Sequence, residues 1–151
     1  EKIKLATEFN SYEDIYLNYN ELKRVINDGN WQERLSRYGG VYLIHDDYTG
    51  KNYIGAAYGE NGGFLGRWED YVNNPTGGEK DKDNVMLREL LENGKYGNNT
   101  KFKGKDYAKK YFKYSILEVL PLGNSTRIRN AESRWKLHLG TRDKKHGLNG
   151  N

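Results

Sequence analysis

A glutamate near the C-terminal end of the chain stands where an apolar side chain would be expected. The residues around Glu132 at the spacing of one helix face are Ile128, Trp135 and Leu139. Burying a carboxylate in such a stripe is costly unless a cation pairs with it. A divalent metal ion would serve, because hard cations prefer carboxylate oxygens. The alternatives are a place at the solvent-exposed edge of the stripe, or an ion pair with Arg129 or Lys136.

An arginine and a tyrosine stand one helical turn apart at Arg67 and Tyr71. Residues at positions i and i+4 of a helix lie on the same side, so the two groups can act on the same ligand. A guanidinium binds a phosphate through two parallel hydrogen bonds. Taken in isolation, the pair is better explained as an exposed arginine next to a packed tyrosine.

Two further tyrosines occur in the tripeptides Gly40-Val41-Tyr42 and Tyr53-Ile54-Gly55, with ten residues between Tyr42 and Tyr53. Tyrosines often serve only to pack across a hairpin. A free phenol has a pKa of about 10, which makes it a poor base at neutral pH. Nearby cations would have to favour the phenolate if either tyrosine is to accept a proton.

The elements that must position these residues form an α+β pattern. A β-hairpin is expected from residues 41–44 and 51–57, with a turn at residues 46–50. Helices are expected at about 64–72, 84–92 and 126–139, and a third strand at 111–120. The sequence therefore predicts a small three-stranded antiparallel sheet flanked by helices.

The 151 residues suffice for one domain with a modest core. Residues 1–39 are expected to form an N-terminal helical extension, with a short helix capped by Asn20 and a further turn at residues 31–35. The candidate site lies entirely within residues 40–151, which we treat as the main domain.

Composition excludes several kinds of protein. The chain has no cysteine, which rules out disulfides, thiolate zinc sites and a cysteine nucleophile. Its three histidines are too scattered to suggest a histidine-based metal site. No apolar run reaches the roughly 20 residues needed to cross a bilayer, so we expect no membrane association and a cytoplasmic location.

Charge is distributed unevenly along the chain. Residues 1–100 carry 12 Lys and Arg against 17 Asp and Glu, whereas residues 101–151 carry 13 against 4. A half this basic is typical of a protein that binds a phosphate backbone, although a solvated lysine-rich surface is the alternative. The lysines clustered among aromatic residues are Lys101, Lys103, Lys105, Lys109, Lys110 and Lys113.

Taken together, the two tripeptides and the downstream residues resemble the GIY-YIG nuclease superfamily. The resemblance covers about residues 40–149 and includes Arg67, Tyr71 and Glu132 on the expected helices. Gly147-Leu148-Asn149 is similar to the segment that closes many members and supplies an asparagine to the site. The resemblance implies a GIY-YIG-like nuclease domain over residues 40–151.

The resemblance also implies a mechanism and a catalytic set, namely Tyr42, Tyr53, Arg67, Tyr71, Glu132 and Asn149. Glu132 would bind one Mg²⁺ or Mn²⁺, and Arg67 would bind the phosphate. Tyr42 would accept a proton from the attacking water, while the other tyrosines position the phosphate and Asn149 braces the site. The expected activity is metal-dependent endonuclease cleavage of nucleic acid, with DNA as the favoured substrate and the clustered lysines along its path.

Two departures from the family pattern keep other functions open. Relatives often have Lys or Ser just after the second tripeptide, where this chain has Ala56, and the segment between Tyr53 and Arg67 contains a longer Gly-rich insertion. One alternative is therefore a non-catalytic nucleic-acid-binding module that retains the nuclease fold. The other is a protein-interaction domain whose tyrosines all belong to the core.

Overall fold

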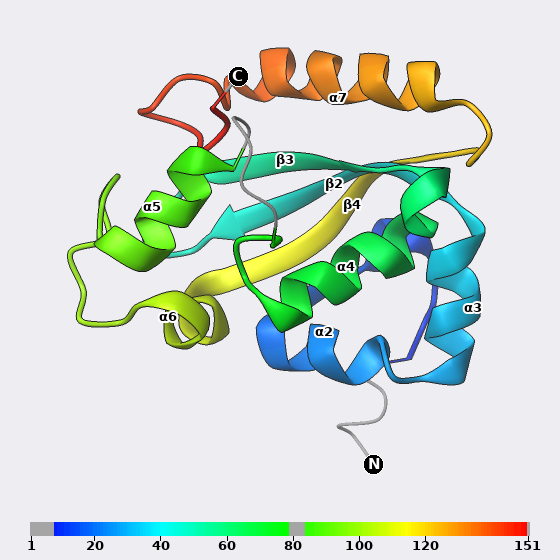
Figure 1. Ribbon diagram of the computed structural model, residues 1–151, viewed down its shortest axis with the longest axis horizontal. Coiled ribbons are helices and arrows are strands. Elements are labelled where there is room, and N and C mark those ends of the chain that lie inside the picture. Colours follow the sequence, from blue (N-terminus) through cyan, green and yellow to red (C-terminus); the bar gives the residue numbers. More distant parts are fainter. Residues whose placement is uncertain (1–7, 79–83, 151) are drawn as a thin grey trace.

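A four-stranded antiparallel sheet forms the centre of the computed structural model, which describes residues 8–78 and 84–150 (Figure 1). The strands are ordered β1-β4-β2-β3 across the sheet. Their bounds are Tyr16–Asn18 (β1), Gly39–Asp46 (β2), Asn52–Ala57 (β3) and Phe112–Leu120 (β4). The α+β class and the β2–β3 hairpin agree with the sequence prediction.

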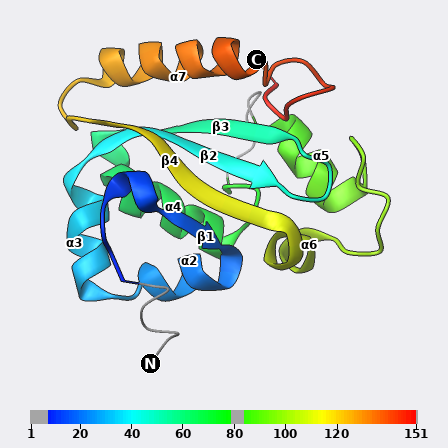
Figure 2. The ribbon, with the colours of Figure 1, turned by 180° about the vertical axis from the view of Figure 1, so that it is seen from behind.

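The prediction of three strands was wrong, because the N-terminal segment supplies the strand β1. Tyr16, Leu17 and Asn18 pair with Ser115, Tyr114 and Lys113 of β4, and Figure 2 shows β1 alongside β4 at that edge of the sheet. Three residues are too few to display the alternation by which a strand is recognised. Pairing with β4, which lies far away in sequence, determines the strand.

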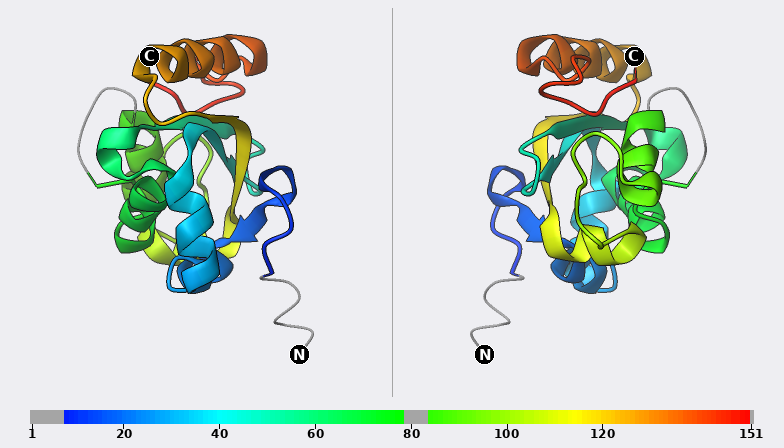
Figure 3. Two further views of the ribbon diagram at one scale, coloured as in Figure 1. Left: turned by 90° about the vertical axis from the view of Figure 1, so that its right-hand side faces the viewer. Right: turned by 90° about the vertical axis from the view of Figure 1, so that its left-hand side faces the viewer.

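Helices cover both faces of the sheet, and α7 is the one helix of the described residues that lies across the second face (Figure 3). Their bounds are Tyr19–Val25 (α2), Gly29–Arg37 (α3), Gly63–Asn73 (α4), Val85–Asn93 (α5), Gly104–Tyr111 (α6) and Ser125–Leu139 (α7). Two short 3₁₀ helices span Tyr12–Asp14 (η1) and Gly59–Asn61 (η2). No helix among the described residues is long and apolar enough to cross a membrane.

One predicted helix begins at a different residue, and one helix was missed. The helix α2 begins after Asn18, not Asn20, because Asn18 accepts a hydrogen bond from the Glu21 N–H at 2.8 Å and Glu21 accepts one from the Asn18 N–H at 2.9 Å. The helix α6 was not predicted at all. Its lysines hide the apolar periodicity, since only Tyr107 and Ala108 are buried in it.

The core is divided by the sheet into two layers. The larger layer packs Tyr42, Trp68 and Tyr71 together with residues of the N-terminal segment such as Leu22 and Trp31. The smaller layer lies between the sheet and α7, and its members are Val41, Ile54, Ala56, Leu120, Ile128 and Ala131. The described part of the N-terminal segment therefore shares one core with the tyrosines of the hairpin.

Candidate active site

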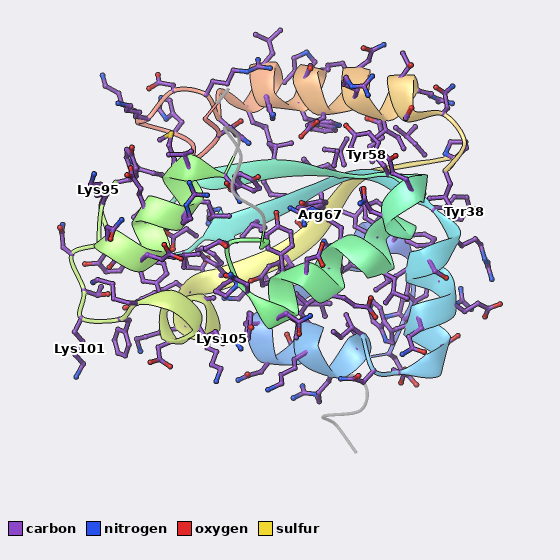
Figure 4. All side chains as sticks on the ribbon, viewed as in Figure 1. Tyr38, Tyr58, Arg67, Lys95, Lys101 and Lys105 are labelled. Atoms are coloured by element: carbon purple, nitrogen blue, oxygen red, sulfur yellow. The ribbon has the colours of Figure 1, made fainter. Side chains whose placement is uncertain are left out.

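A pocket of about 590 Å³ lies at the outer edge of β3, where α4 and α7 approach from opposite faces of the sheet. Four of the predicted site residues line it, namely Tyr42, Tyr53, Arg67 and Glu132. In Figure 4, Arg67 is labelled on the α4 side of β3 and Tyr58 on the α7 side. Strand, helix and loop segments that are distant in sequence therefore converge on one cavity.

The glycine of the second tripeptide makes room for the tyrosine of the first. A Cβ at residue 55 would lie 2.2 Å from Cζ of Tyr42 and 2.3 Å from its hydroxyl oxygen. Because Tyr42 and Gly55 are register partners on adjacent strands, the ring lies directly across the glycine backbone. Only glycine allows Tyr42 to occupy this position.

Tyr42 is hydrogen-bonded to Tyr71, with their hydroxyl oxygens 2.7 Å apart. Burial raises the pKa of Tyr42 well above its ordinary value, and the nearby Tyr71 raises this pKa further, while Arg67 partly opposes both. The neutral phenol is therefore favoured at neutral pH. This direction is opposite to the one that a phenolate base requires.

Arg67 is held in place from two sides. One of its nitrogens, Nη1, donates to the carbonyl oxygen of Gly77 at 3.0 Å and lies 3.0 Å from the Asp70 carboxylate. Its guanidinium also lies 4.8 Å from the ring centroid of Tyr71. Burial lowers the pKa of Arg67, but Tyr42, Tyr71, Tyr53 and Asp70 together raise it by more. The site therefore holds a permanent, oriented cation.

Glu132 has two neighbours that were not assigned to the site from the sequence. The Tyr58 hydroxyl donates to Oε1 at 3.4 Å, and Nζ of Lys136 lies 3.5 Å from Oε2. The side chains of Glu132 and Lys136 are only 15% and 6% exposed. Of the alternatives left open by the sequence, the ion pair with Lys136 is therefore present, while the carboxylate still faces the pocket.

The apolar stripe around Glu132 is shorter than expected. Ile128 is fully buried and Trp135 is half-buried, but Leu139 is 37% exposed. The Trp135 indole donates to Glu118 at 2.9 Å. Glu132 thus lies at the end of the buried stripe, next to the pocket.

A metal ion at this site would have few protein ligands. The described residues contain no group of three or more His, Cys, Asp or Glu side chains able to hold a metal ion. Mg²⁺ is often bound by one or two carboxylates, with waters and substrate phosphates completing its shell. Glu132 fits such a shared site, because its carboxylate lines a polar pocket that also contains Arg67.

Asn149 lies beside the outer edge of β3 and does not line the pocket. Its side chain accepts a hydrogen bond from the Ile54 N–H and donates one to the Ile54 carbonyl oxygen, both at 2.9 Å. It is 1% exposed. Its contacts fix the strand that carries Tyr53 and Gly55, so it contacts the site only through this strand.

Five of the six clustered lysines lie on α6 or the segment before it, and none of the six lines the pocket. Figure 4 shows Lys101 and Lys105 at the outer margin of the molecule. Within residues 8–78 and 84–150, no ion pair involves Lys101, Lys103, Lys105, Lys109 or Lys110. Lys113, in contrast, is paired with Asp47 at 2.6 Å. The cluster on and before α6 thus carries positive charge without a neighbouring carboxylate partner.

Sequence reasoning missed Tyr58 and assigned Lys136 only as a possible partner of Glu132. The i, i+4 spacing of Glu132 and Lys136 was a usable signal. Tyr58 follows β3 in an irregular segment, where no periodicity marks it. Its approach to Glu132 depends on how α7 packs across the sheet.

Comparisons with models of protein families, with curated proteins and with solved structures gave no match.

Proposed function

We propose that this chain is a metal-dependent endonuclease of the GIY-YIG type that hydrolyses phosphodiester bonds in nucleic acid, with DNA as the favoured substrate. One observation supports this most: Tyr42, Tyr53, Arg67 and Glu132 line the same pocket. These are the residues whose spacing suggested the family. Cleavage requires neutralisation of the phosphate and activation of a nucleophile, and the pocket contains groups suited to both tasks.

Arg67 is the phosphate-binding group in this proposal. Its contacts with Gly77 and Asp70 hold the guanidinium before the substrate arrives, so little reorganisation is needed on binding. Its raised pKa keeps the guanidinium charged at neutral pH. A planar fork also fixes the orientation of the phosphate, which a lysine would not do.

Glu132 is the residue that would hold Mg²⁺ or Mn²⁺. Such a metal ion, when bound, supplies Lewis-acid stabilisation of the phosphate and of the leaving oxygen. Lys136 and Tyr58 contact the two carboxylate oxygens and fix their direction. They therefore act as positioning residues for Glu132.

Tyr42 is proposed to accept the proton of the attacking water, and this role is the most demanding one. Its pKa is raised by burial and by Tyr71, so its surroundings disfavour the phenolate form that would accept the proton. Arg67 is the described group that opposes this shift. Proton acceptance by Tyr42 would then make the cleavage rate climb into the alkaline range. Tyr53 and Tyr71 would orient the phosphate and the Tyr42 hydroxyl.

A non-catalytic nucleic-acid-binding module remains the second candidate. It is favoured by the raised pKa of Tyr42 and by Ala56, which offers no side-chain donor to the pocket. The lysines on and before α6 would serve either function, because both require a phosphate-backbone contact.

Nicking of supercoiled plasmid separates the two candidates. The parent protein should nick plasmid with Mg²⁺ or Mn²⁺ and lose this activity with a chelator. Glu132→Gln should abolish nicking while DNA binding is retained. Glu92→Gln, at an exposed position of α5, is the matched control and should cut like the parent. A parent protein that binds plasmid without any metal-dependent nicking would favour the binding module.

A further inference from the structure

The strand β3 lies at an edge of the sheet, so only one side of its backbone pairs with β2. In an antiparallel pair, the residues of one strand alternate between bonding to the partner strand and facing away from it. The outward-facing residues of an edge strand present their N–H and C=O groups to whatever lies beside the sheet.

The C-terminal segment shows which residues of β3 face outward. The Asn52 N–H donates to the His146 carbonyl oxygen at 3.2 Å, and the Leu148 N–H donates to the Asn52 carbonyl oxygen at 2.9 Å. The Asn149 side chain is hydrogen-bonded to both backbone groups of Ile54: it accepts from the N–H and donates to the carbonyl oxygen, each at 2.9 Å. Residues 146–149 therefore cover the outer side of β3 as far as Ile54.

Ala56 is the next outward-facing residue, by the same alternation. It pairs with Val41 in the register of the hairpin, two residues beyond the pair Leu43 and Ile54, so its N–H and C=O point away from β2. Residues 146–149 do not extend this far, and no described backbone or side-chain group outside the hairpin bonds to Ala56. Ala56 lines the pocket instead.

We propose that the backbone N–H of Ala56 is a phosphate-binding group of this pocket, donating a hydrogen bond to a non-bridging oxygen of a phosphate that Arg67 also binds. This proposal rests on the proposed nuclease function, because it names a subsite for the same phosphodiester. Ala56 stands at the position where members of the GIY-YIG superfamily, which the chain resembles, often have Lys or Ser. The donor here is the main chain, and no side chain is required.

Geometry and energetics both suit this role. An N–H held by the β2–β3 ladder is already oriented, so no reorganisation is needed when charge develops on the phosphate. The small side chain of Ala56 packs against the face of the sheet that α7 covers, with Ile128 and Ala131. Because this side chain points to that face, it does not cover the backbone N–H at the free edge of the strand. This N–H belongs to the peptide bond that follows Gly55, and the Tyr42 ring lies across Gly55. A phosphate bound here would be adjacent to Tyr42 and Arg67.

The first test is nuclear magnetic resonance of the ¹⁵N-labelled full chain, titrated with inorganic phosphate without metal. The Ala56 amide signal should shift and saturate together with the side-chain Nε signal of Arg67. The Ala57 amide, which faces β2 in the same register, is the internal reference and should move much less. Saturation at Arg67 without a response at Ala56, or no saturable response at either residue, would overturn the proposal.

The second test replaces the amide N–H itself. Substituting L-lactic acid for Ala56 converts the peptide bond to an ester and keeps the methyl group. Phosphate affinity should then fall roughly 10- to 100-fold, the effect of losing one hydrogen bond to a charged group. The same substitution at Ala57 is the matched control, which should lower the melting temperature but leave phosphate affinity unchanged. Equal phosphate affinity in the Ala56 ester and the parent would contradict the proposal.

Plasmid nicking measured in parallel distinguishes this inference from the proposed function. A chain that shows the Ala56 response but never nicks DNA would refute the nuclease and leave the anion subsite in place. A chain that nicks DNA, and whose Ala56 ester binds phosphate as tightly as the parent does, would refute the subsite and leave the nuclease in place.

Discussion

The ring of Tyr42 lies across the backbone of Gly55, with Cζ only 2.2 Å from the place that a Cβ on residue 55 would occupy. The two tripeptides are therefore parts of a single contact between β2 and β3. Gly55→Ala should push the Tyr42 ring out of its place, with a stability loss of about 1–3 kcal/mol, as for other overpacked cores. Urea unfolding measures the stability of the Gly55→Ala protein and plasmid nicking measures its activity. Stability and activity should both be lower than in the parent.

Gly29→Ala is the matched control for this substitution, because a Cβ at residue 29 meets no atom within 4 Å. The control should be as stable as the parent and equally active. A Gly55→Ala protein with full stability and activity would show that Tyr42 need not lie across residue 55.

Two fully buried tyrosines should make the fold sensitive to alkali. Burial raises the pKa of both Tyr42 and Tyr114 well above the ordinary value of 10. In the unfolded chain these phenols ionise near pH 10, while in the folded chain they remain neutral. Their contribution to stability is therefore complete below pH 10 and is lost progressively as the pH rises above it.

Tyr114→Phe should weaken this alkaline loss at little cost at neutral pH. The Tyr114 hydroxyl is buried and has no hydrogen-bond partner among the described residues. The free energy of unfolding, measured from pH 7 to 11, should fall less steeply for Tyr114→Phe than for the parent. Tyr48→Phe, at an exposed position, should follow the parent curve, and identical curves for all three proteins would contradict the assignment.

The Glu132–Lys136 ion pair predicts strongly non-additive mutations. Lys136→Met leaves a largely buried carboxylate without its cation, so we expect a stability loss of about 1–3 kcal/mol. Adding Glu132→Gln to this variant should restore part of the loss, because the uncompensated charge is removed. A double-mutant cycle by urea unfolding gives the coupling, and simple additivity of the two changes would argue against a mutual contact.

The lysines of α6 should contribute to nucleic-acid affinity through their charge on the phosphate backbone. Removing a lysine that neutralises one phosphate should reduce the slope of log affinity against log salt by about 0.9 for duplex DNA. Lys109→Ala combined with Lys110→Ala should therefore reduce the slope, as measured by fluorescence anisotropy with a labelled duplex. Lys23→Ala combined with Arg24→Ala removes the same charge from α2 and is the control. Equal slopes for the two double variants would show that α6 has no special role in binding.

Local sequence patterns predicted the parts of the fold that carry their own signal. The β2–β3 hairpin, α5 and α7 lie close to their expected positions, because each combines apolar periodicity with a turn or cap residue. The strand β1 and the helix α6 were missed for opposite reasons. β1 is too short for any period, and the apolar residues of α6 are hidden among lysines.

The site residues, like the helices and strands, were predictable only where the signal is local in sequence. Tyr42, Arg67 and Glu132 were identified because their motifs and spacings are local properties of the chain. Their convergence on one pocket, the Tyr58–Glu132 contact and the outward direction of Ala56 depend on tertiary packing. The raised pKa of Tyr42 arises from burial, from Tyr71 and from Glu132, which only the folded chain brings together.

The cleavage rate of Tyr42→Phe decides whether the Tyr42 hydroxyl accepts the proton of the attacking water, because this change removes one hydroxyl and keeps the ring across Gly55. The measurement is single-turnover cleavage of a labelled duplex with saturating Mg²⁺, from pH 6 to 10, for the parent, Tyr42→Phe and Tyr53→Phe. We expect the Tyr42→Phe rate to fall about 10²- to 10⁴-fold, as for loss of a general base, and Tyr53→Phe to lose less. The parent rate should climb with pH, since the raised pKa of Tyr42 keeps it neutral at pH 7. A Tyr42→Phe protein that cuts at the parent rate would show that Tyr42 is not the proton acceptor.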